Sequence, residues 1–433
     1  MGKGATPSLH DEKIRKSIPK DIANHIDNLY NSGRYYLVDT YIKKVAEEQD
    51  IECLKGYLEE KEKFHKCDGN VITTHRKLLH MDEETLSKFD VIIIDEDIIL
   101  KSIIPNQMDI PRSDLDSIIK IARKDLKEER ITIKTFNQLC KKVMDVRKSI
   151  KTKTLLKVDN FDYEIKEKYG KDKKEPPDGT PTPIDVPSFC LASHFYFRKA
   201  SDEKNLDEDT ITFLKPLKLK EGFKYIILSA TASEDVCKHY FGEDNIIFHN
   251  CKQHQYRGNL YQIYDKPFSR DYIDKYNNQH GNIFSDIKKR YGIEHILTFK
   301  RFAERYNLGS LWYGNNEGSN IYEGKDLCVV GTPHALEFKY KLFAYTLGLD
   351  FDEDAQLKHN LPVTHNGYRF RFTTYEDEIL RSIQFWIIES ELEQAVGRAR
   401  LLRHDCTVYL FSNFPVQQAV MRVSEHEKTK DIA

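Results

Sequence analysis

An acidic cluster follows an apolar run in the first quarter of the chain. Residues 89–94, Phe-Asp-Val-Ile-Ile-Ile, are almost continuously β-branched and end in Asp95-Glu96-Asp97. Such a run is typical of a parallel strand covered on both faces, and ligands of open α/β sheets bind beyond the carboxyl ends of the strands. An Asp at this position can hold Mg²⁺ on nucleotide phosphates while the adjacent Glu deprotonates water. The alternative is a set of solvated turn residues.

Alternating arginines follow a glycine near the C-terminus. Residues 393–403 read Glu-Gln-Ala-Val-Gly-Arg-Ala-Arg-Leu-Leu-Arg. Guanidinium groups at a helix end can donate paired hydrogen bonds to a triphosphate and supply charge to the transition state of phosphoryl transfer. The alternative is a basic helix face exposed to solvent. The other motifs in the chain, and their order, are needed to choose between these two interpretations.

Further polar segments adjoin apolar strands between these two. The strand at residues 225–228 ends in Ser229-Ala230-Thr231-Ala232, as the first strand ends in acidic residues. Three more segments combine a strand pattern with hydroxyl, imidazole or amide side chains: residues 71–79, 295–300 and 317–333. The chain therefore repeats one design, in which an apolar strand delivers polar side chains at its carboxyl end.

In this order the segments resemble the motifs of superfamily 2 helicases. VIIIDED resembles the DEAD/DEAH segment, LSATA resembles the Ser-Ala-Thr coupling motif, and QAVGRAR resembles the final arginine motif. The Glu-Gly-Ser-Asn segment at 317–320, with the strand after it, is similar to a motif of DinG-like helicases. The resemblance runs from about residue 70 to 412. It implies an α/β fold of two RecA-like lobes with parallel sheets, with ATP in the cleft and a single nucleic-acid strand crossing both lobes.

The resemblance also implies a role for individual residues. The catalytic residues that it implies are Asp95, Glu96, Arg398 and Arg400, with Asp95 holding Mg²⁺ through water. It implies nucleotide binding by Gln394, Gly397, Gly318 and Asn320, and coupling of hydrolysis to strand movement by Ser229 and Thr231. The implied nucleic-acid contacts are Thr73, Thr74, His75, Thr298, Lys300 and Thr332. Hydroxyl groups at strand ends also cap helices, so loop polarity is the alternative for the Ser and Thr residues.

The chain departs from the helicase pattern in four respects. Ile98 stands where DEAH proteins carry His, Asn320 replaces the usual Asp, and the GRAR spacing leaves open which arginine reaches the γ-phosphate. The fourth departure is that no G-x-x-x-x-G-K-[ST] sequence occurs, so the amide cradle and Lys that hold the phosphates are missing. We expect the chain to begin downstream of that loop, as a fragment, a split-gene product or a degenerate helicase, with a separate N-terminal polypeptide as a candidate partner.

The pattern of elements predicts the domain organisation. Residues 1–100 are expected to form a partial first lobe that begins with helices at 11–66, and residues 191–240 its remainder. An inserted helical module and a Pro-rich linker are expected at 101–190, where residues 101–175 carry 20 Lys or Arg against 13 Asp or Glu. The additional Lys and Arg side chains could contact DNA or simply form a solvated helix surface. Residues 241–433 are expected to form the second lobe, with strands at 245–248, 259–264, 295–299, 326–330 and 406–411.

Composition limits the class of protein. The formal net charge of -2 excludes a generally basic nucleic-acid coat protein, and no apolar run approaches the roughly 18 residues of a membrane span. No secretory signal is visible, so we expect a cytoplasmic protein without a membrane partner. The eight cysteines form no C-x-x-C pair; Cys53 and Cys67, with nearby histidines, could bind a metal, but ordinary helix residues are the favoured interpretation.

The ordered motifs and their resemblance to helicases favour an ATP-hydrolysing enzyme, a helicase or translocase that uses Mg²⁺. The implied substrate is single-stranded or forked DNA, with RNA as an open alternative. The competing hypothesis is a subunit that binds nucleic acid or assists assembly, derived from a helicase that lost ATP binding. The missing phosphate loop motivates it.

Overall fold

The computed structural model describes residues 4–5, 9, 12–31, 33–66, 69–163, 184–203, 206–215, 217–251, 254–315 and 319–424. The chain divides into two compact units, Met1–Leu228 (unit 1) and Ser229–Ala433 (unit 2). Among the described residues, no helix has the length and apolar character that a membrane crossing requires.

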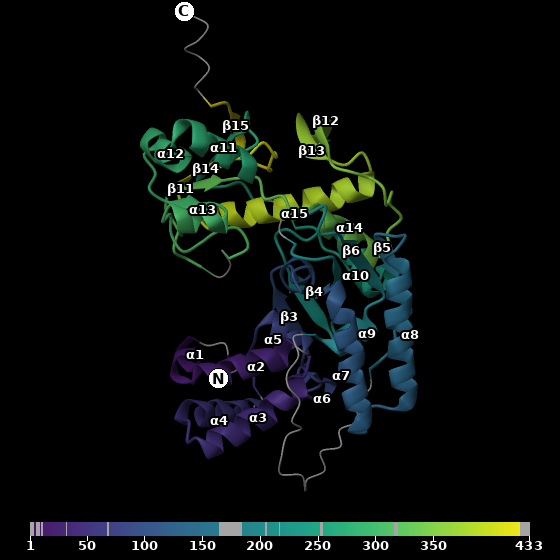
Figure 1. The fold of residues 1–433 in the computed structure, drawn as a ribbon. Coiled ribbons are helices and arrows are strands. Elements are labelled where there is room, and N and C mark those ends of the chain that lie inside the picture. Colours follow the sequence, from purple (N-terminus) through teal and green to yellow (C-terminus); the bar gives the residue numbers. More distant parts are fainter. Residues whose placement is uncertain are drawn as a thin grey trace, which may run out of the picture. The chain divides into compact units, whose positions relative to one another are not determined.

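Unit 1 begins with four helices, which Figure 1 shows in purple: α1 (Glu12–Ser17), α2 (Lys20–Asn31), α3 (Tyr35–Glu48) and α4 (Glu52–His65). Ile22, Ile26 and Leu29 recur at helical spacing in α2 and are at most 2% exposed, so one stripe of the helix enters a shared core. The helices predicted for residues 11–66 are confirmed.

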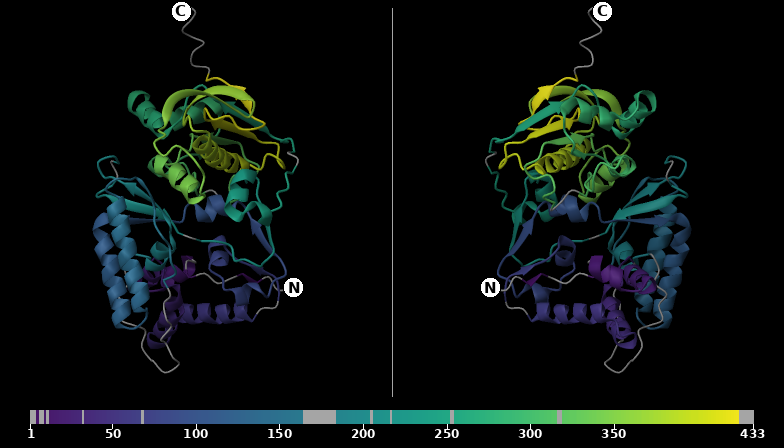
Figure 2. Two further views of the ribbon diagram at one scale, coloured as in Figure 1. Left: turned by 90° about the vertical axis from the view of Figure 1, so that its right-hand side faces the viewer. Right: turned by 90° about the vertical axis from the view of Figure 1, so that its left-hand side faces the viewer.

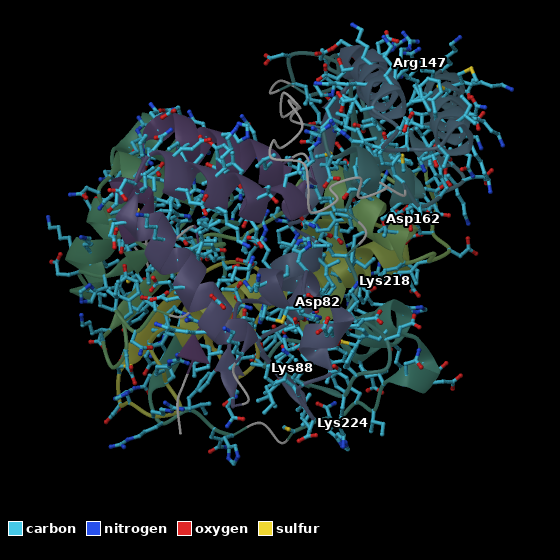
Figure 3. The ribbon with its side chains drawn as sticks, turned by 90° about the horizontal axis from the view of Figure 1, so that it is seen from below. Asp82, Lys88, Arg147, Asp162, Lys218 and Lys224 are labelled. Atoms are coloured by element: carbon cyan, nitrogen blue, oxygen red, sulfur yellow. The ribbon has the colours of Figure 1, made fainter. Side chains whose placement is uncertain are left out.

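Unit 1 also contains two short parallel strand pairs, one of which includes β1, the strand that precedes the helices in the chain. β1 (Gly4–Ala5) pairs with β2 (Val71–Ile72), and β3 (Ile92–Asp95) pairs with β8 (Tyr225–Leu228). Between β2 and β3 lie α5 (His75–Leu79) and α6 (Glu83–Leu86). Asp82, labelled in Figure 3, caps α6 by accepting a hydrogen bond from the backbone N of Thr85 at 2.7 Å.

One face of the β3–β8 pair is not covered, contrary to our prediction for this strand. Ile93 is 66% exposed, its register partner Ile226 is 44% exposed, and Leu228 is 54% exposed. Ile94, on the opposite face of β3, is 1% exposed. The β-branched run therefore packs on one side only, because no element of the described chain covers the other side.

The segment between β3 and β8 contains more than the helices that we predicted for 101–190. Its helical elements are η1 (Ile99–Ile103), η2 (Arg112–Asp114), α7 (Leu115–Lys127), α8 (Ile133–Ser149) and α9 (Val186–Leu191). Its strands form an antiparallel sheet of order β4-β7-β6-β5: β4 (Gln107–Pro111), β5 (Leu155–Lys157), β6 (His194–Arg198) and β7 (Thr210–Leu214). The sheet corrects the purely helical expectation for 101–190. Pro111 argues against a strand at β4, and β5 has only three residues. The sheet also corrects the boundary at residue 190, because β6 and β7, which fall in the predicted remainder of the first lobe, complete the same sheet. The Pro-rich stretch at 176–183 lies outside the described residues.

The helices of this segment pack against one face of the antiparallel sheet. Phe189, Phe195 and Phe213 are completely buried, with ring centroids 5.3 to 6.3 Å apart. Lys142 of α8 enters the same core, and its Nζ donates to the main-chain oxygens of Asp159, Cys190 and Ala192 at 2.9, 3.0 and 2.6 Å. Figure 3 labels Arg147, which lies on α8 and forms an ion pair with Asp116 of α7.

Unit 2 is built on a five-stranded parallel sheet of order β10-β11-β14-β9-β15. Its strands are β9 (Asn259–Ile263), β10 (Ile296–Leu297), β11 (Leu327–Val330), β14 (Thr407–Phe411) and β15 (Val420–Arg422). Four of the five predicted strands are confirmed within a residue or two. The strand predicted at 245–248 is wrong: a 3-10 turn, η3 (Glu243–Asn245), is followed by a segment in which Ile247 is 82% exposed.

Helices cover both faces of this sheet. Alternate residues of β11 enter different cores: Leu327 and Val329 pack in one cluster, Cys328 and Val330 in the other. The second cluster includes residues of α11 (Arg270–His280), α12 (Ile283–Tyr291) and α13 (Lys300–Arg305); the first includes residues of α15 (Glu378–Gly397). Figure 1 shows α15 as the long helix of this unit. The prediction of an α/β fold with parallel sheets is confirmed.

Two further helices and a hairpin complete the described part of unit 2. They are α10 (Glu234–Phe241), α14 (Glu337–Thr346) and a separate antiparallel hairpin of β12 (Lys358–His365) and β13 (Tyr368–Thr374). Figure 2 shows unit 2 from two sides.

Candidate functional site

The acidic cluster lies at the carboxyl end of β3. Asp95 is the last residue of the strand and stands opposite Leu228 in register. Its side chain is exposed, and its carboxylate has no partner in the described part of the chain. Glu96 adopts φ 75°, a region that non-glycine residues rarely occupy, and its backbone N donates to the oxygen of Leu228 at 2.8 Å. The backbone thus turns sharply where the first acidic pair begins, a feature common at functional sites.

The segment from Thr73 to His75 lies beside this strand end. Thr74 caps α5, its hydroxyl oxygen accepting from the backbone N of Lys77 at 3.2 Å. His75 Nε2 lies 2.7 Å from the main-chain oxygen of Asp95, so this nitrogen must carry the proton. Two segments that are 20 residues apart in the sequence, and were predicted to serve different ligands, are therefore in contact.

Sequence reasoning missed the role of Asp97. Its Oδ1 accepts hydrogen bonds from the backbone N of Ile99 and Leu100 at 2.9 and 3.2 Å, while Oδ2 has no partner among the described residues. Burial raises the pKa of this carboxyl. Asp97 fixes the turn after the acidic pair. Ile98, which replaces the DEAH histidine, is 1% exposed and offers no polar contact.

The Ser-Ala-Thr segment is tethered to α15 within unit 2. Ser229 Oγ accepts from the backbone N of Thr231 at 3.1 Å, which closes a tight turn. The main-chain oxygen of Thr231 accepts from Trp386 Nε1 at 2.9 Å and from Ser390 Oγ at 3.4 Å. The sequence predicted coupling through hydroxyl groups, but the contact with α15 is made by the Thr231 backbone carbonyl and the Trp386 indole, which is not part of the motif.

Most of the predicted arginine and nucleotide-binding residues lie at or near the C-terminal end of α15. Arg398 is 6% exposed, and its Nε donates to the main-chain oxygen of Gln394 at 3.1 Å. The side-chain oxygen of Gln394 is buried without a partner in the described structure. Arg400 has φ 58° and its Nη2 lies 3.5 Å from Oδ1 of Asn320. Gly397 ends the helix, whereas Gly318 lies outside the described residues.

These contacts show which of the predicted unit 2 residues lie close together. Asn320 and Arg400 are 80 positions apart in the sequence and meet at one surface. The orphaned oxygen of Gln394 is a hydrogen-bond acceptor that a ligand group could satisfy, because a buried amide oxygen without a donor is costly. The donor set suits the hydroxyl and phosphate groups of a nucleotide.

A pocket of about 590 Å³ lies between the Ser-Ala-Thr segment and α15. His365 Nε2 lies 3.0 Å from Glu389 Oε2, and Asn366 Nδ2 donates to Glu389 Oε1 at 2.6 Å. One turn further along α15, burial and the neighbouring Glu389 carboxylate raise the pKa of Glu393 to about 7. The pocket therefore contains a carboxyl group that gains or loses its proton near neutral pH.

Two predicted nucleic-acid contacts are wrong. Thr298 is completely buried and its hydroxyl donates to the main-chain oxygen of Val330 at 2.8 Å. Thr332 is 1% exposed and its hydroxyl donates to the oxygen of Pro267 at 2.7 Å. Both hydroxyls satisfy polar groups inside unit 2, so they are not available to a phosphate. Lys300 is exposed, with Nζ 5.5 Å from the ring centroid of Trp312.

The metal hypothesis for the cysteines finds no support in the described structure. Cys53 is half-buried on α4, and Cys67 lies outside the described residues. Within the described ranges, no group of three or more His, Cys, Asp or Glu side chains is arranged to hold a metal ion.

Comparison with known proteins gives only structural likeness. No protein-family model matches the chain, and no curated protein matches it. A solved structure described as XPD_Helicase is 14% identical, with a TM-score of 0.36, and the match covers 86% of this chain and 74% of the other. The structure of S. tokodaii Xpd4 is 12% identical, with a TM-score of 0.39 and coverage of 91% and 96%. The chain is thus distantly similar in structure to XPD helicases, a likeness too low to carry an argument about function.

Proposed function

We propose that this protein is the body of an ATP-dependent helicase or translocase that moves along a nucleic-acid strand. The observation that carries the proposal is the parallel pairing of β3 with β8. It places the carboxyl end of the acidic strand beside the strand that leads directly into Ser229-Ala230-Thr231. Two motifs more than 130 residues apart thus leave one sheet edge together, at the carboxyl ends of strands, where ligands of open α/β sheets bind.

The proposed architecture has two RecA-like lobes. The first comprises the parallel strands β1, β2, β3 and β8, with the segment between β3 and β8 as an insert. The second is the five-stranded parallel sheet of unit 2 with the helices on its two faces. The fully parallel order of that sheet supports this assignment.

The proposed chemistry assigns one task to each polar group. Asp95 suits a Mg²⁺ ion, because its exposed carboxylate has no partner in the described chain; bound there, the ion would neutralise charge on the phosphates. Glu96 would accept a proton from the attacking water. Arg398 and Arg400 would place positive charge against the γ-phosphate, and Gln394 and Asn320 would hydrogen-bond the nucleotide.

The proposed nucleic-acid contacts are sequence-independent. Thr73, Thr74 and His75 of unit 1 and Lys300 of unit 2 offer hydroxyl, imidazole and ammonium groups to sugar and phosphate. Trp312 beside Lys300 is half-buried and offers a ring on which a base can stack.

Two observations favour a second candidate, a strand-binding subunit without ATPase activity of its own. The sequence contains no G-x-x-x-x-G-K-[ST], and the uncovered face of β3 and β8 exposes Ile93, Ile226 and Leu228. Parallel sheets are normally covered on both faces. A separate polypeptide that carries the phosphate loop is therefore the partner that we propose for this face.

The test measures strand binding and ATP hydrolysis by the same preparation. Filter binding of labelled single-stranded DNA and RNA is followed by binding of a fluorescent ATP analogue with Mg²⁺ and by ATPase assays with and without the strand. The helicase proposal expects nucleic-acid-stimulated hydrolysis that Glu96→Gln abolishes while nucleotide binding remains. Strand binding without nucleotide binding would select the second candidate, and the absence of strand binding would refute both.

A further inference from the structure

The hairpin of β12 and β13 is a two-stranded ribbon that no motif of the sequence explains. Among the described residues its strands pair only with each other, and Figure 1 shows them on one side of α15. Asn366 and Gly367 form the turn with φ 49° and 78°, the conformation that a two-residue hairpin turn needs to match the strand twist. The ribbon is therefore locally well specified.

The inner face of the ribbon is fixed to α15. Val363 and Phe372 are buried in the core of unit 2, and the Phe372 ring centroid lies 5.8 Å from Phe385 of α15. Thr374 Oγ1 donates to Gln384 Oε1 of the same helix at 2.5 Å. Because α15 ends at the proposed nucleotide-binding residues, the ribbon packs on the same helix that carries those residues.

The outer face of the ribbon is cationic. Arg369 and Arg371 are both exposed and, being two positions apart on one strand, they point to the same face. No Asp or Glu occurs between residues 358 and 374, although the chain as a whole has 69 acidic residues against 67 basic ones. Neither arginine has an ion pair in the described part of the chain; Arg371 Nη1 donates to the main-chain oxygen of Asn360 at 3.1 Å.

Edge protection explains only part of this arrangement. Charged side chains and proline keep exposed strand edges from pairing with other chains, and Pro362 fits that use. Protection of a strand edge does not explain why carboxylates are absent, because acidic side chains prevent pairing with another strand as effectively as basic side chains do. A face with cations alone generates a positive potential beside which polyanions accumulate.

We propose that the outer face of this ribbon binds the phosphates that flank the major groove of double-stranded DNA. A two-stranded β-ribbon fits the major groove of B-form DNA, which is about 12 Å wide, whereas the major groove of A-form RNA is too deep and narrow for side chains to read. The inference rests on the proposed function and adds to it a contact with the duplex part of a forked substrate. Movement of α15 during nucleotide turnover would be transmitted to the duplex through the ribbon.

The test compares duplex and single-strand binding by the full chain. Fluorescence anisotropy of labelled duplex DNA, single-stranded DNA and duplex RNA is measured over a range of salt concentrations for wild type and Arg369→Ala/Arg371→Ala. Each lost phosphate contact lowers the slope of log K against log salt by about 0.9. We expect a slope smaller by about 2 and, at about 0.1 M salt, an affinity for duplex DNA lower by about 60-fold. Single-strand affinity should stay within about twofold.

Matched variants control for charge and for folding. Lys275→Ala/Lys289→Ala removes two exposed cations from α11 and α12 of the same unit and should leave duplex binding unchanged. Arg369→Lys/Arg371→Lys keeps the charges and should restore most of the affinity. Circular dichroism verifies that every variant keeps the wild-type helix content.

The outcomes separate this inference from the proposed function. Wild-type protein that binds single strands but not duplex DNA, or an alanine variant that binds the duplex as well as wild type, overturns the ribbon contact and leaves the strand-binding proposal intact. An equal loss on duplex RNA overturns the assignment to B-form DNA. Protein that binds neither strands nor duplex refutes both proposals.

Discussion

Replacing Glu393 by Gln should stabilise unit 2 in a strongly pH-dependent manner. Glu393 lies on α15 beside Glu389, which is already engaged by His365 and Asn366. Burial, and secondly the Glu389 carboxylate, raise the pKa of Glu393 from 4.5 to about 7. The folded protein therefore favours the protonated, neutral form of Glu393, which Gln imitates at every pH.

The sign and size of the effect follow from proton linkage. Between pH 4.5 and 7 the folded state binds more protons at Glu393 than the unfolded state, so its contribution to stability falls as pH rises. Each unit of pKa difference is worth about 1.4 kcal/mol, so the rise from 4.5 to about 7 lowers the free energy of unfolding above pH 7 by about 3 kcal/mol relative to pH 4.5. Glu393→Gln should thus unfold like wild type at pH 4.5 and be more stable by about 3 kcal/mol above pH 7.

Tryptophan fluorescence isolates this unit. The two tryptophans of the chain, Trp312 and Trp386, both lie in unit 2, so urea unfolding followed by their emission reports on it. Glu294→Gln, which alters a largely exposed carboxylate in the same unit, serves as the control and should change stability by less than about 0.5 kcal/mol. A stability difference between Glu393→Gln and wild type that does not grow from pH 4.5 to 8 would refute the linkage argument.

Three further predictions concern other contacts. In protein that hydrolyses ATP, Arg398→Ala should lower kcat by roughly 10³-fold, measured by steady-state ATPase; a change in KM alone would assign Arg398 to binding. Lys142→Met removes one donor from each of three main-chain oxygens, of which only that of Cys190 keeps another hydrogen bond within the described chain, from the backbone N of Phe161 at 3.1 Å. The change should destabilise unit 1 by roughly 3 kcal/mol in urea unfolding followed by circular dichroism, whereas Lys141→Met, at the exposed neighbouring position, should have little effect. Trp386→Phe removes the donor to the Thr231 oxygen and should reduce nucleic-acid stimulation of ATP hydrolysis while the basal rate remains, and undiminished stimulation would show that this tether does not couple the sites.

The sequence alone determined where polar side chains follow strands and helices, because strand ends and helix ends have local signatures. The run before Asp95, the strand before Ser229 and the turn-prone segment at Asn320 can each be recognised from their neighbours in the chain. The parallel character of the unit 2 sheet was also predictable, since its strands alternate with helical segments. Local pattern missed the antiparallel sheet of β4 to β7, because Pro111 interrupts the pattern of β4 and β5 has only three residues.

Only the tertiary structure decided which polar groups remain available. Thr298 and Thr332 were predicted from the same kind of segment as Thr74, yet both are buried and their hydroxyls donate to main-chain oxygens. Thr74 instead caps α5 at an exposed position. The tether from Trp386 to Thr231, the contact between His75 and Asp95 and the pairing of Arg400 with Asn320 each join residues far apart in the chain. Such contacts depend on the packing of whole elements, and the residue types of a motif do not encode where a distant helix will place its side chains.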